Sequence, residues 1–333
     1  MSPAATGGRR PRVLLASGPV APLSARAAAI ALAEGFAEGA QVAVIGLAEG
    51  GPELTRALTE PGGEIEFLHT GRVGRRPDLL VVGESPGSDP APEPAGDPLA
   101  GSSAGLGRML GYALQADVPA RVVVDLTGTD SHDAGQGLLA ELSAVRDRLA
   151  DCELIGVVPA GQENDQLLGL RGVTSRKGRA LGIPAERMLA VDAELERFAH
   201  ALAPGSARED GAGAAGGLGF LILALGGRLV TGAALCAELA QLDRALGSAD
   251  LVVTACDSFD FGSRGGGVVA ELARRCEGFE VPLVVVSPVV GVSGREMRTL
   301  GIESAHPVDA HVDPSEALTA TARRLAEGWT ARW

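Results

Sequence analysis

The chain has 333 residues, which is enough for two domains with a large apolar core. Apolar residues make up 46% of it and aromatic residues 3%, a mixture typical of α/β layers built from Val-rich strands and Ala-rich helices. The net charge of −13 repels phosphate backbones, so we expect no nucleic-acid partner.

The four cysteines lie far apart and form no C-x-x-C pair, which excludes the common zinc and disulfide patterns and fits a reducing, cytoplasmic compartment. No run approaches the roughly 18 apolar residues of a membrane span, so no membrane partner is expected. The start "RRPRVLLASGPVAPLSA" resembles an export signal, but Pro19 and Pro22 interrupt its short apolar part. We interpret it as a first buried strand.

Short Val/Leu-rich runs and helical patterns alternate along the chain. Seven runs predict strands that are parallel and buried on both faces: 12–17, 41–46, 78–83, 121–126, 153–158, 250–255 and 282–287. Helices are predicted near 24–39, 104–115, 133–150, 186–203, 233–246, 265–276 and 314–328, the first with Ser24 as its N-cap. This alternation indicates a doubly wound α/β fold.

Two stretches interrupt the alternation and are expected to be loops: the Pro-rich, acidic 85–98 and the Gly-rich 203–217. We expect two α/β domains with a cleft between them. Residues 1–62 and 232–333 are predicted to form a discontinuous Rossmann-like outer domain. Residues 63–231 are predicted to form an inserted α/β domain that contains the glycine-rich segment.

The stretch "EDGAGAAGGLGF" (Glu209–Phe220) contains a formal G-x-G-x-x-G match at Gly211, Gly213 and Gly216. A dinucleotide fingerprint needs a hydrophobic strand directly before the glycines. The preceding "ALAPGSARED" is not a strand sequence, so a dinucleotide site is not predicted.

Loops that follow the predicted strands are rich in glycine, hydroxyl residues and aspartate, as in "TGTDSHDAGQG" and "TACDSFDFGSRGGG". In open α/β sheets, ligands bind at such loops. Phosphate cradles and metal-binding carboxylates use these residue types, and so do ordinary loops.

Taken in order, these motifs resemble the bacterial glycerate kinase family from about Val13 to His306. The segment "GAGAAGGLG" matches that family's glycine signature letter for letter. "AEGGPELTRAL", "DPLAGSSAGLG", "NDQLLGLRG" with "RKG", and "LGSADLVVT" are similar to further family segments in altered form. The resemblance implies that the glycines let a helix start close to a ligand or to the opposing domain.

The resemblance also implies ATP-dependent phosphoryl transfer, with Mg²⁺, to a hydroxyl of glycerate or a related small hydroxy acid. Asp133 and Asp260 would be catalytic, and Asp133 would hold the metal. The implied substrate residues are Glu49, Ser102, Ser103, Lys177 and Ser263. The implied cofactor residues are Gly211, Gly213, Gly216, Gly217, Gly219 and Thr254.

Several charged positions of the family pattern are missing here. The family's D-S-F-K-G falls on residues 17–21, so that its lysine is Val20, and the lysine of its later G-K pair falls on Gly267. Lys177 is the only lysine among 29 cationic residues, so a site that needs a cation should carry arginine. Arg264 or Arg171 could substitute from a neighbouring position.

Two hypotheses therefore stay open: a weak or altered kinase that uses ATP and Mg²⁺, and a catalytically silent pseudoenzyme, without cofactor, that binds a small anion or a partner protein. Individual residues have alternatives as well. Asp133 could cap a helix, Lys177 could be an exposed loop cation, Cys256 could be a small apolar residue, and His132 could be a hydrogen-bonding loop histidine. A homodimer is also left open.

Overall fold

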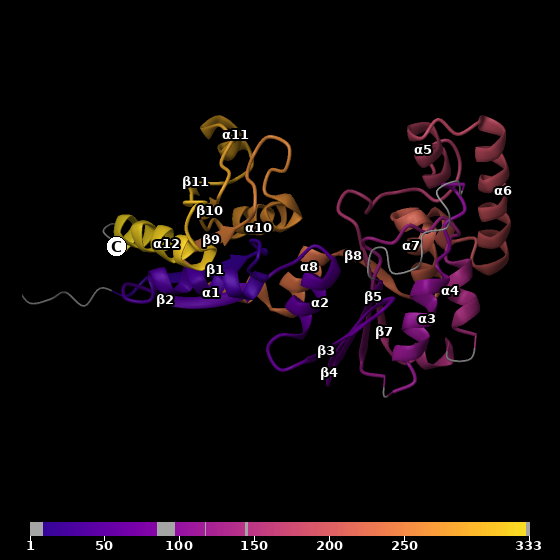
Figure 1. Cartoon of the computed structure of the whole chain (residues 1–333), viewed down its shortest axis with the longest axis horizontal. Coiled ribbons are helices and arrows are strands. Elements are labelled where there is room, and N and C mark those ends of the chain that lie inside the picture. Colours follow the sequence, from indigo (N-terminus) through magenta and orange to yellow (C-terminus); the bar gives the residue numbers. More distant parts are fainter. Residues whose placement is uncertain (1–8, 85–96, 117, 144–145, 331–333) are drawn as a thin grey trace, which may run out of the picture. The chain divides into compact units, whose positions relative to one another are not determined.

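The structure is a computed structural model that describes residues 9–84, 97–116, 118–143 and 146–330 (Figure 1). The chain divides into two compact units. Unit 1 comprises Met1–Ala48 and Cys236–Trp333, and unit 2 comprises Glu49–Leu235. Most of the expected 85–98 loop lies outside the described residues. Within the described ranges, no helix is both long and apolar enough to span a bilayer.

Unit 1 contains a five-stranded parallel sheet in the order β11-β10-β9-β1-β2. Its strands are β1 (Arg12–Ser17), β2 (Gln41–Gly46), β9 (Leu251–Ala255), β10 (Leu283–Ser287) and β11 (Ser304–Pro307). Counted along the chain within this unit, the order is 2-1-3-4-5, which is a doubly wound, Rossmann-like arrangement. The strand order reverses between β1 and β9, and ligands of such folds bind outside the carboxyl ends of the strands at this point.

Helices of unit 1 cover the sheet. They are α1 (Ala25–Phe36), α9 (Leu242–Leu246), α10 (Gly266–Phe279), α11 (Gly294–Thr299) and α12 (Pro314–Thr330), and α8 (Gly232–Leu239) spans the boundary between the units. The Ser24 hydroxyl caps α1 by accepting from the Ala27 N–H at 3.3 Å, as predicted. α1 and α12 pack closely at Gly35, where a Cβ would lie 2.5 Å from the Cβ of Ala322.

Unit 2 contains a six-stranded mixed sheet in the order β3-β4-β5-β6-β7-β8. An antiparallel meander, β3 (Glu64–Leu68), β4 (Gly71–Arg76) and β5 (Leu79–Glu84), precedes the parallel strands β6 (Arg121–Asp125), β7 (Glu153–Val158) and β8 (Arg228–Thr231). Each later parallel strand is added on the same side of the previous one. Right-handed crossovers then place the connecting helices on one face of the sheet.

The helices of unit 2 are α2 (Gly51–Thr59), α3 (Ala104–Ala113), α4 (Gln136–Glu141), α5 (Val173–Ala180), α6 (Ala185–Leu202) and α7 (Ala214–Ala224). Short 3-10 turns occupy Arg146–Leu149 and Ser206–Arg208. Helices α3, α4 and α7 share one apolar core with β5, β6 and β7, and Figure 1 shows them on the same side of the sheet. Helix α2 packs against β4 and β5.

The α/β fold class is confirmed, and the predictions for one strand and two helices need correction. β2 occupies the predicted residues but is an exposed edge strand and is not buried on both faces. The predicted helix 133–150 is replaced by α4 and a 3-10 turn, because the chain first forms a loop with Ala134 and Gly135 at positive φ. The predicted helix 233–246 is two helices, α8 and α9, separated at Gln241 with a φ of 52°.

Candidate functional site

In unit 1, the loops after β1 and β9 are joined at the point where the strand order reverses. The Ala255 N–H donates to Ser17 Oγ at 3.2 Å, and the Ala21 N–H donates to Asp257 Oδ1 at 2.8 Å. Thr254, at the end of β9, is fully buried, and its hydroxyl has no hydrogen-bond partner among the described residues. Hydrogen bonds within unit 1 therefore hold this junction in place. The buried hydroxyl of Thr254 remains available to a ligand.

The loop after β9 holds the predicted residues Asp260 and Ser263. Asp260 Oδ1 accepts from the N–H groups of Gly262 and Ser263, both at 2.8 Å, and Oδ2 accepts from Ser258 Oγ at 2.8 Å. The Ser263 N–H is the largest of the interactions that lower the pKa of Asp260, so this carboxylate stays ionised at neutral pH. Oδ2 keeps an acceptor site free for one further ligand.

The same loop leads into α10 through three residues with left-handed backbone. Arg264, Gly265 and Gly266 have φ values of 48°, 80° and 76°. The exposed Arg264 guanidinium lies 5.7 Å from the ring centre of Phe261. The N–H groups of Arg264, Gly265 and Gly266 already donate to Asp260 and Ser263 within the loop, so the exposed guanidinium is the group that the loop can offer to an anion.

In unit 2, Ser103 and Asp133 are brought together at the carboxyl end of β6. Asp133 Oδ2 accepts from the Ser103 N–H and hydroxyl, both at 2.9 Å, and from the Gly137 N–H at 3.1 Å, while Oδ1 accepts from the Gly135 N–H at 2.9 Å. Ser102 Oγ accepts from the Ala104 N–H at 3.2 Å. These contacts tie the loop before α4 to the start of α3. The N-cap of α4 is Gly135, so Asp133 is not the capping residue that the alternative predicts.

The glycine run packs against the unit's own loops. Ala215, Gly216 and Gly217 have positive φ values of 49°, 68° and 94°. A Cβ on Gly216 would lie 1.8 Å from the carbonyl oxygen of Ser131, and one on Gly213 would lie 2.2 Å from that of Gln166. The glycines are therefore required by the close approach of backbone to backbone. Binding of a cofactor at these glycines, Gly211 and Gly219 included, stays a prediction.

His132 and Lys177 lie near this junction. His132 is buried, its Nε2 lies 3.0 Å from Thr174 Oγ1, and its Nδ1 has no partner among the described residues. Burial, with a smaller effect of Lys177, lowers the pKa of His132 to about 4. Lys177 Nζ pairs with Asp130 at 2.8 Å. Lys177 therefore already neutralises a carboxylate of its own unit.

The sequence reasoning missed a buried ion pair between Arg72 of β4 and Asp125 of β6. Asp125 also accepts from the Gly51 N–H at 2.7 Å and from Thr127 Oγ1 at 2.6 Å. A Cβ on Gly50 would lie 2.0 Å from Thr127 Oγ1. The ion pair thus anchors the "AEGG" segment, and Asp125, an acid that ends an apolar strand, was the available signal. Glu49 in this segment is exposed.

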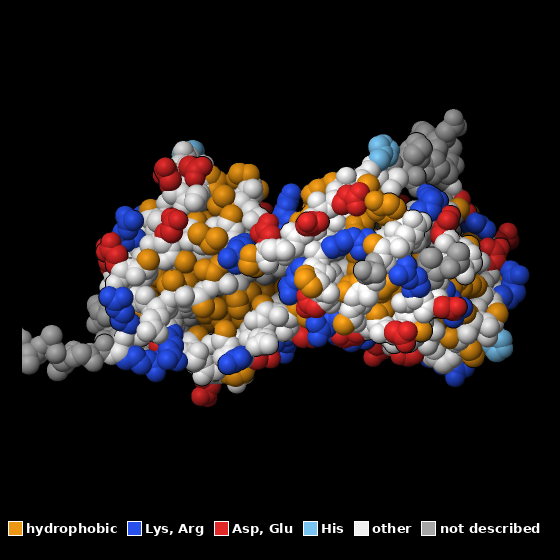
Figure 2. All heavy atoms as spheres, turned by 90° about the horizontal axis from the view of Figure 1, so that it is seen from below, with side chains coloured by type: hydrophobic (Ala, Val, Ile, Leu, Met, Phe, Trp, Pro, Cys, Tyr) orange, Lys and Arg blue, Asp and Glu red, His pale blue; other side chains and the backbone are white. Residues whose placement is uncertain are grey.

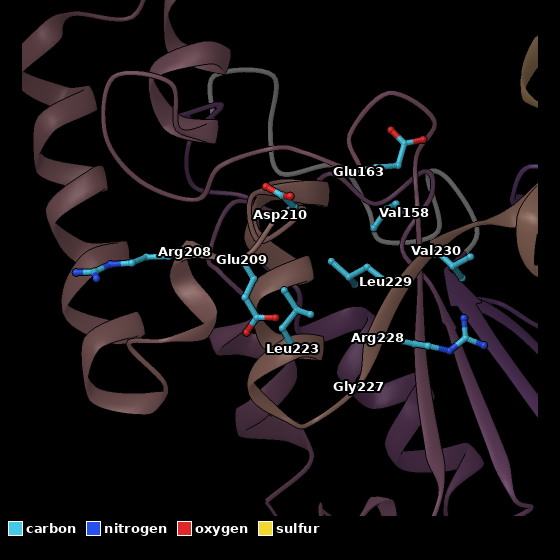
Figure 3. Close-up of a pocket in the computed structure, with 10 residues that line it drawn as sticks. All are labelled: Val158, Glu163, Arg208, Glu209, Asp210, Leu223, Gly227, Arg228, Leu229 and Val230. Atoms are coloured by element: carbon cyan, nitrogen blue, oxygen red, sulfur yellow. The ribbon is translucent and has the colours of Figure 1, made fainter.

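A cavity of about 630 Å³ lies along β8 and α7 in unit 2 (Figure 3). It contains none of the predicted site residues. Its charged side chains point in different directions, with Arg208 and Arg228 directed away from Asp210. In the described ranges, no group of three or more His, Cys, Asp or Glu residues is arranged to hold a metal ion. This cavity is therefore not an assembled catalytic site.

Comparisons with known proteins agree with the motifs. The family model described as the glycerate kinase family matches residues 140–332. Uncharacterised proteins of Mycobacterium bovis and Mycobacterium tuberculosis are 34% identical over 206 residues, which is 60% of this chain and 53% of theirs. The chain thus spans about half the length of these relatives. A glycerate kinase of Bacillus subtilis is 26% identical over 337 residues. The alignment covers 86% of this chain and 86% of that protein.

A crystal structure of glycerate kinase 2 from Salmonella typhimurium LT2 matches with a TM-score of 0.80 at 22% identity, over 97% of this chain and 99% of that chain. At this identity, the likeness bears on the fold alone. The two-unit α/β architecture and the family model over more than half of the sequence lead to the same assignment. The chain belongs to the glycerate kinase family.

Proposed function

We propose that this chain is an ATP-dependent phosphotransferase that acts on glycerate or a related small hydroxy acid, at a low rate. One observation carries the proposal: the loop after β9 holds Asp260, Ser263 and an exposed Arg264 at the start of a 14-residue helix. Phosphoryl transfer needs positive charge and N–H donors around the phosphates. The exposed Arg264 guanidinium carries both the positive charge and N–H donors on this segment.

Arg264 would take over the charge that the missing family lysines carry elsewhere. It precedes Gly267, on which one family lysine falls, by three positions. Mg²⁺, when bound with the nucleotide, neutralises charge on the β- and γ-phosphates, and Asp260 Oδ2 has an acceptor site left to hold it. The buried hydroxyl of Thr254 in unit 1 has no hydrogen-bond partner among the described residues. A polar ligand that contacts Thr254 Oγ1 would supply the missing hydrogen bond.

A silent homologue that binds an anion or a partner protein is the second candidate, and two observations favour it. Val20, on which the other family lysine falls, is 2% exposed, so no cation can act from that position without rearrangement. The carboxylate of Asp133 accepts four hydrogen bonds from neighbouring loops of its own unit, which occupy acceptor sites that a metal ion would need. Losing one preorganised charge contact costs roughly 10²–10³ in rate, which is why a low rate is expected even in the first reading.

The test is an assay of purified protein with Mg-ATP and D-glycerate that detects phosphoglycerate directly. We expect slow turnover, well below the roughly 1–100 s⁻¹ of typical kinases. Turnover within tenfold of that range would exclude the silent homologue. No turnover, together with no thermal shift from Mg-ATP, would exclude the kinase.

A further inference from the structure

The outer edge of β2 carries backbone groups to which no described strand is bonded. The Gln41 N–H donates to Pro11 O and the Leu47 N–H donates to Ser17 O, both at 2.8 Å, so the odd-numbered residues face β1. Strand geometry then turns the N–H and C=O groups of Val42, Val44 and Gly46 outward. β2 is the last strand of its sheet. The outer edge is therefore a template for another strand.

The other described edge strands carry protective features that β2 lacks. β3 alternates Glu64 and Glu66 with apolar residues, β8 has four residues and begins with Arg228, and β11 has four residues and ends with Pro307. Charge, proline and short length are the usual means of blocking an edge. β2 has six residues, "QVAVIG", with no charge and no proline. Its edge is suited to pairing.

Apolar side chains continue from this edge onto α1. Val42 is 40% exposed and Ile30 is 41% exposed. Gly35 of α1 faces α12, and Ile30 lies five residues earlier, about 140° around the helix. Ile30 thus lies on the side of α1 away from α12. Figure 1 draws β2 and α1 on the lower side of unit 1, and Figure 2, seen from below, shows hydrophobic side chains gathered on that face.

Charges at the two ends of α1 are complementary to each other. Arg26 lies in the first turn, beside Gly46, whose Cβ would lie 3.1 Å from the Arg26 nitrogen. Glu38 follows the last turn. Neither residue forms an ion pair within the described part of the chain. In an antiparallel arrangement of two α1 helices, each arginine end would lie beside a glutamate end.

We propose that β2 pairs with β2 of a second copy of this chain, antiparallel, about a two-fold axis perpendicular to the sheet. The two five-stranded sheets then form one continuous sheet across the dimer. Arg26 of each copy faces Glu38 of the partner subunit, and Ile30 and Val42 pack beside the axis. A second copy is the occupant because an antiparallel pair of identical strands is self-complementary, as a two-fold interface requires. The dimer is independent of the catalytic proposal.

Sedimentation analysis of the full chain between about 1 and 100 µM tests the dimer. Val42→Pro removes an outward N–H and leaves the hydrogen bonds to β1 in place. We expect the wild-type chain to dimerise and Val42→Pro to weaken the dimer at least tenfold, since two backbone hydrogen bonds are lost per dimer. Val42→Thr, the matched control, should stay within threefold. Circular dichroism shows whether both variants remain folded.

A charge exchange tests the geometry without altering the strand. Arg26→Glu and Glu38→Arg should each weaken the dimer about three- to tenfold, and the double variant should restore it. A chain that is monomeric at 100 µM would overturn the proposal. A dimer that tolerates Val42→Pro, or single charge variants that the double variant does not rescue, would overturn it as well.

Discussion

Gly216 is the residue at which the glycine signature is most tightly constrained. Its φ is 68°, and a Cβ would lie 1.8 Å from the carbonyl oxygen of Ser131. Gly182 has the same φ of 68° with no heavy atom within 4 Å of the added carbon. An alanine at Gly182 would therefore experience backbone strain alone, whereas an alanine at Gly216 would experience backbone strain and steric overlap.

We predict that Gly182→Ala lowers the free energy of unfolding by about 1–2 kcal/mol, which is the cost of left-handed backbone alone. Gly216→Ala should cost about 1–3 kcal/mol more, because the Ser131 loop must also move. Urea unfolding of both variants measures the difference. Equal losses would mean that packing against residue 131 does not explain this glycine.

His132 makes the stability of unit 2 depend on pH. Burial lowers its pKa from 6.5 to about 4, so the folded state holds the neutral form while the unfolded chain takes up a proton below pH 6.5. Stability from this group is complete above pH 6.5 and is lost as the pH falls toward 4, by at most about 3 kcal/mol. Urea unfolding between pH 4.5 and 7.5 should show this slope.

His132→Gln provides the control for this slope, because glutamine has no titration in the range. The variant should flatten the pH dependence relative to the wild type, even if its stability is lower throughout. A variant whose slope equals that of the wild type would show that other groups cause the dependence.

Some site residues were visible in the sequence and others were not. The glycines were identified by their signature, but their contacts with residues 131 and 166 depend on tertiary packing. Asp133 fitted both a catalytic and a capping role, and its four hydrogen bonds hold the loops before α3 and α4, while Gly135 is the N-cap of α4. Arg72 could not be found, because it lies in the polar segment "GRVGRR", which has no strand pattern.

At the scale of elements, apolar strands were predictable because burial on both faces requires continuous Val and Leu. β1, β2 and β7 occupy the predicted residues. The β3–β4 hairpin, β8 and β11 were missed, because they are polar or only four residues long. The exposure of β2 could not be predicted either, since an edge position follows from strand order and not from composition.

The contact between α1 and α12 depends on Gly35. A Cβ there would lie 2.5 Å from the Ala322 Cβ and 2.7 Å from the Arg323 nitrogen. We predict that Gly35→Ala destabilises unit 1 by about 1–3 kcal/mol despite its better helix propensity, because the helices must separate. Gly278→Ala in α10, where no heavy atom lies within 4 Å, should stabilise by up to about 1 kcal/mol. Thermal unfolding of the two variants measures these changes. A Gly35→Ala variant more stable than the wild type would contradict the close contact of α1 and α12 at this glycine.

At the scale of the whole molecule, unit 1 has the strand reversal at which doubly wound sheets bind ligands, between β1 and β9. We propose that this position takes part in phosphoryl transfer, on the basis of the chain's membership of the glycerate kinase family. The lysine positions of the family pattern hold Val20 and Gly267, and Arg264 lies in the loop that follows β9. The catalytic proposal therefore depends on whether this guanidinium contacts the phosphates.

The most direct test is the rate of phosphoglycerate formation from Mg-ATP and D-glycerate by Arg264→Ala, compared with Arg298→Ala. Arg298 is also an exposed arginine, on α11 of the same unit. Loss of a transition-state charge contact predicts a fall of roughly 10²–10³ for Arg264→Ala, with Arg298→Ala within twofold of the wild type. An Arg264→Ala variant that keeps the wild-type rate would contradict the assignment of this loop to the phosphates.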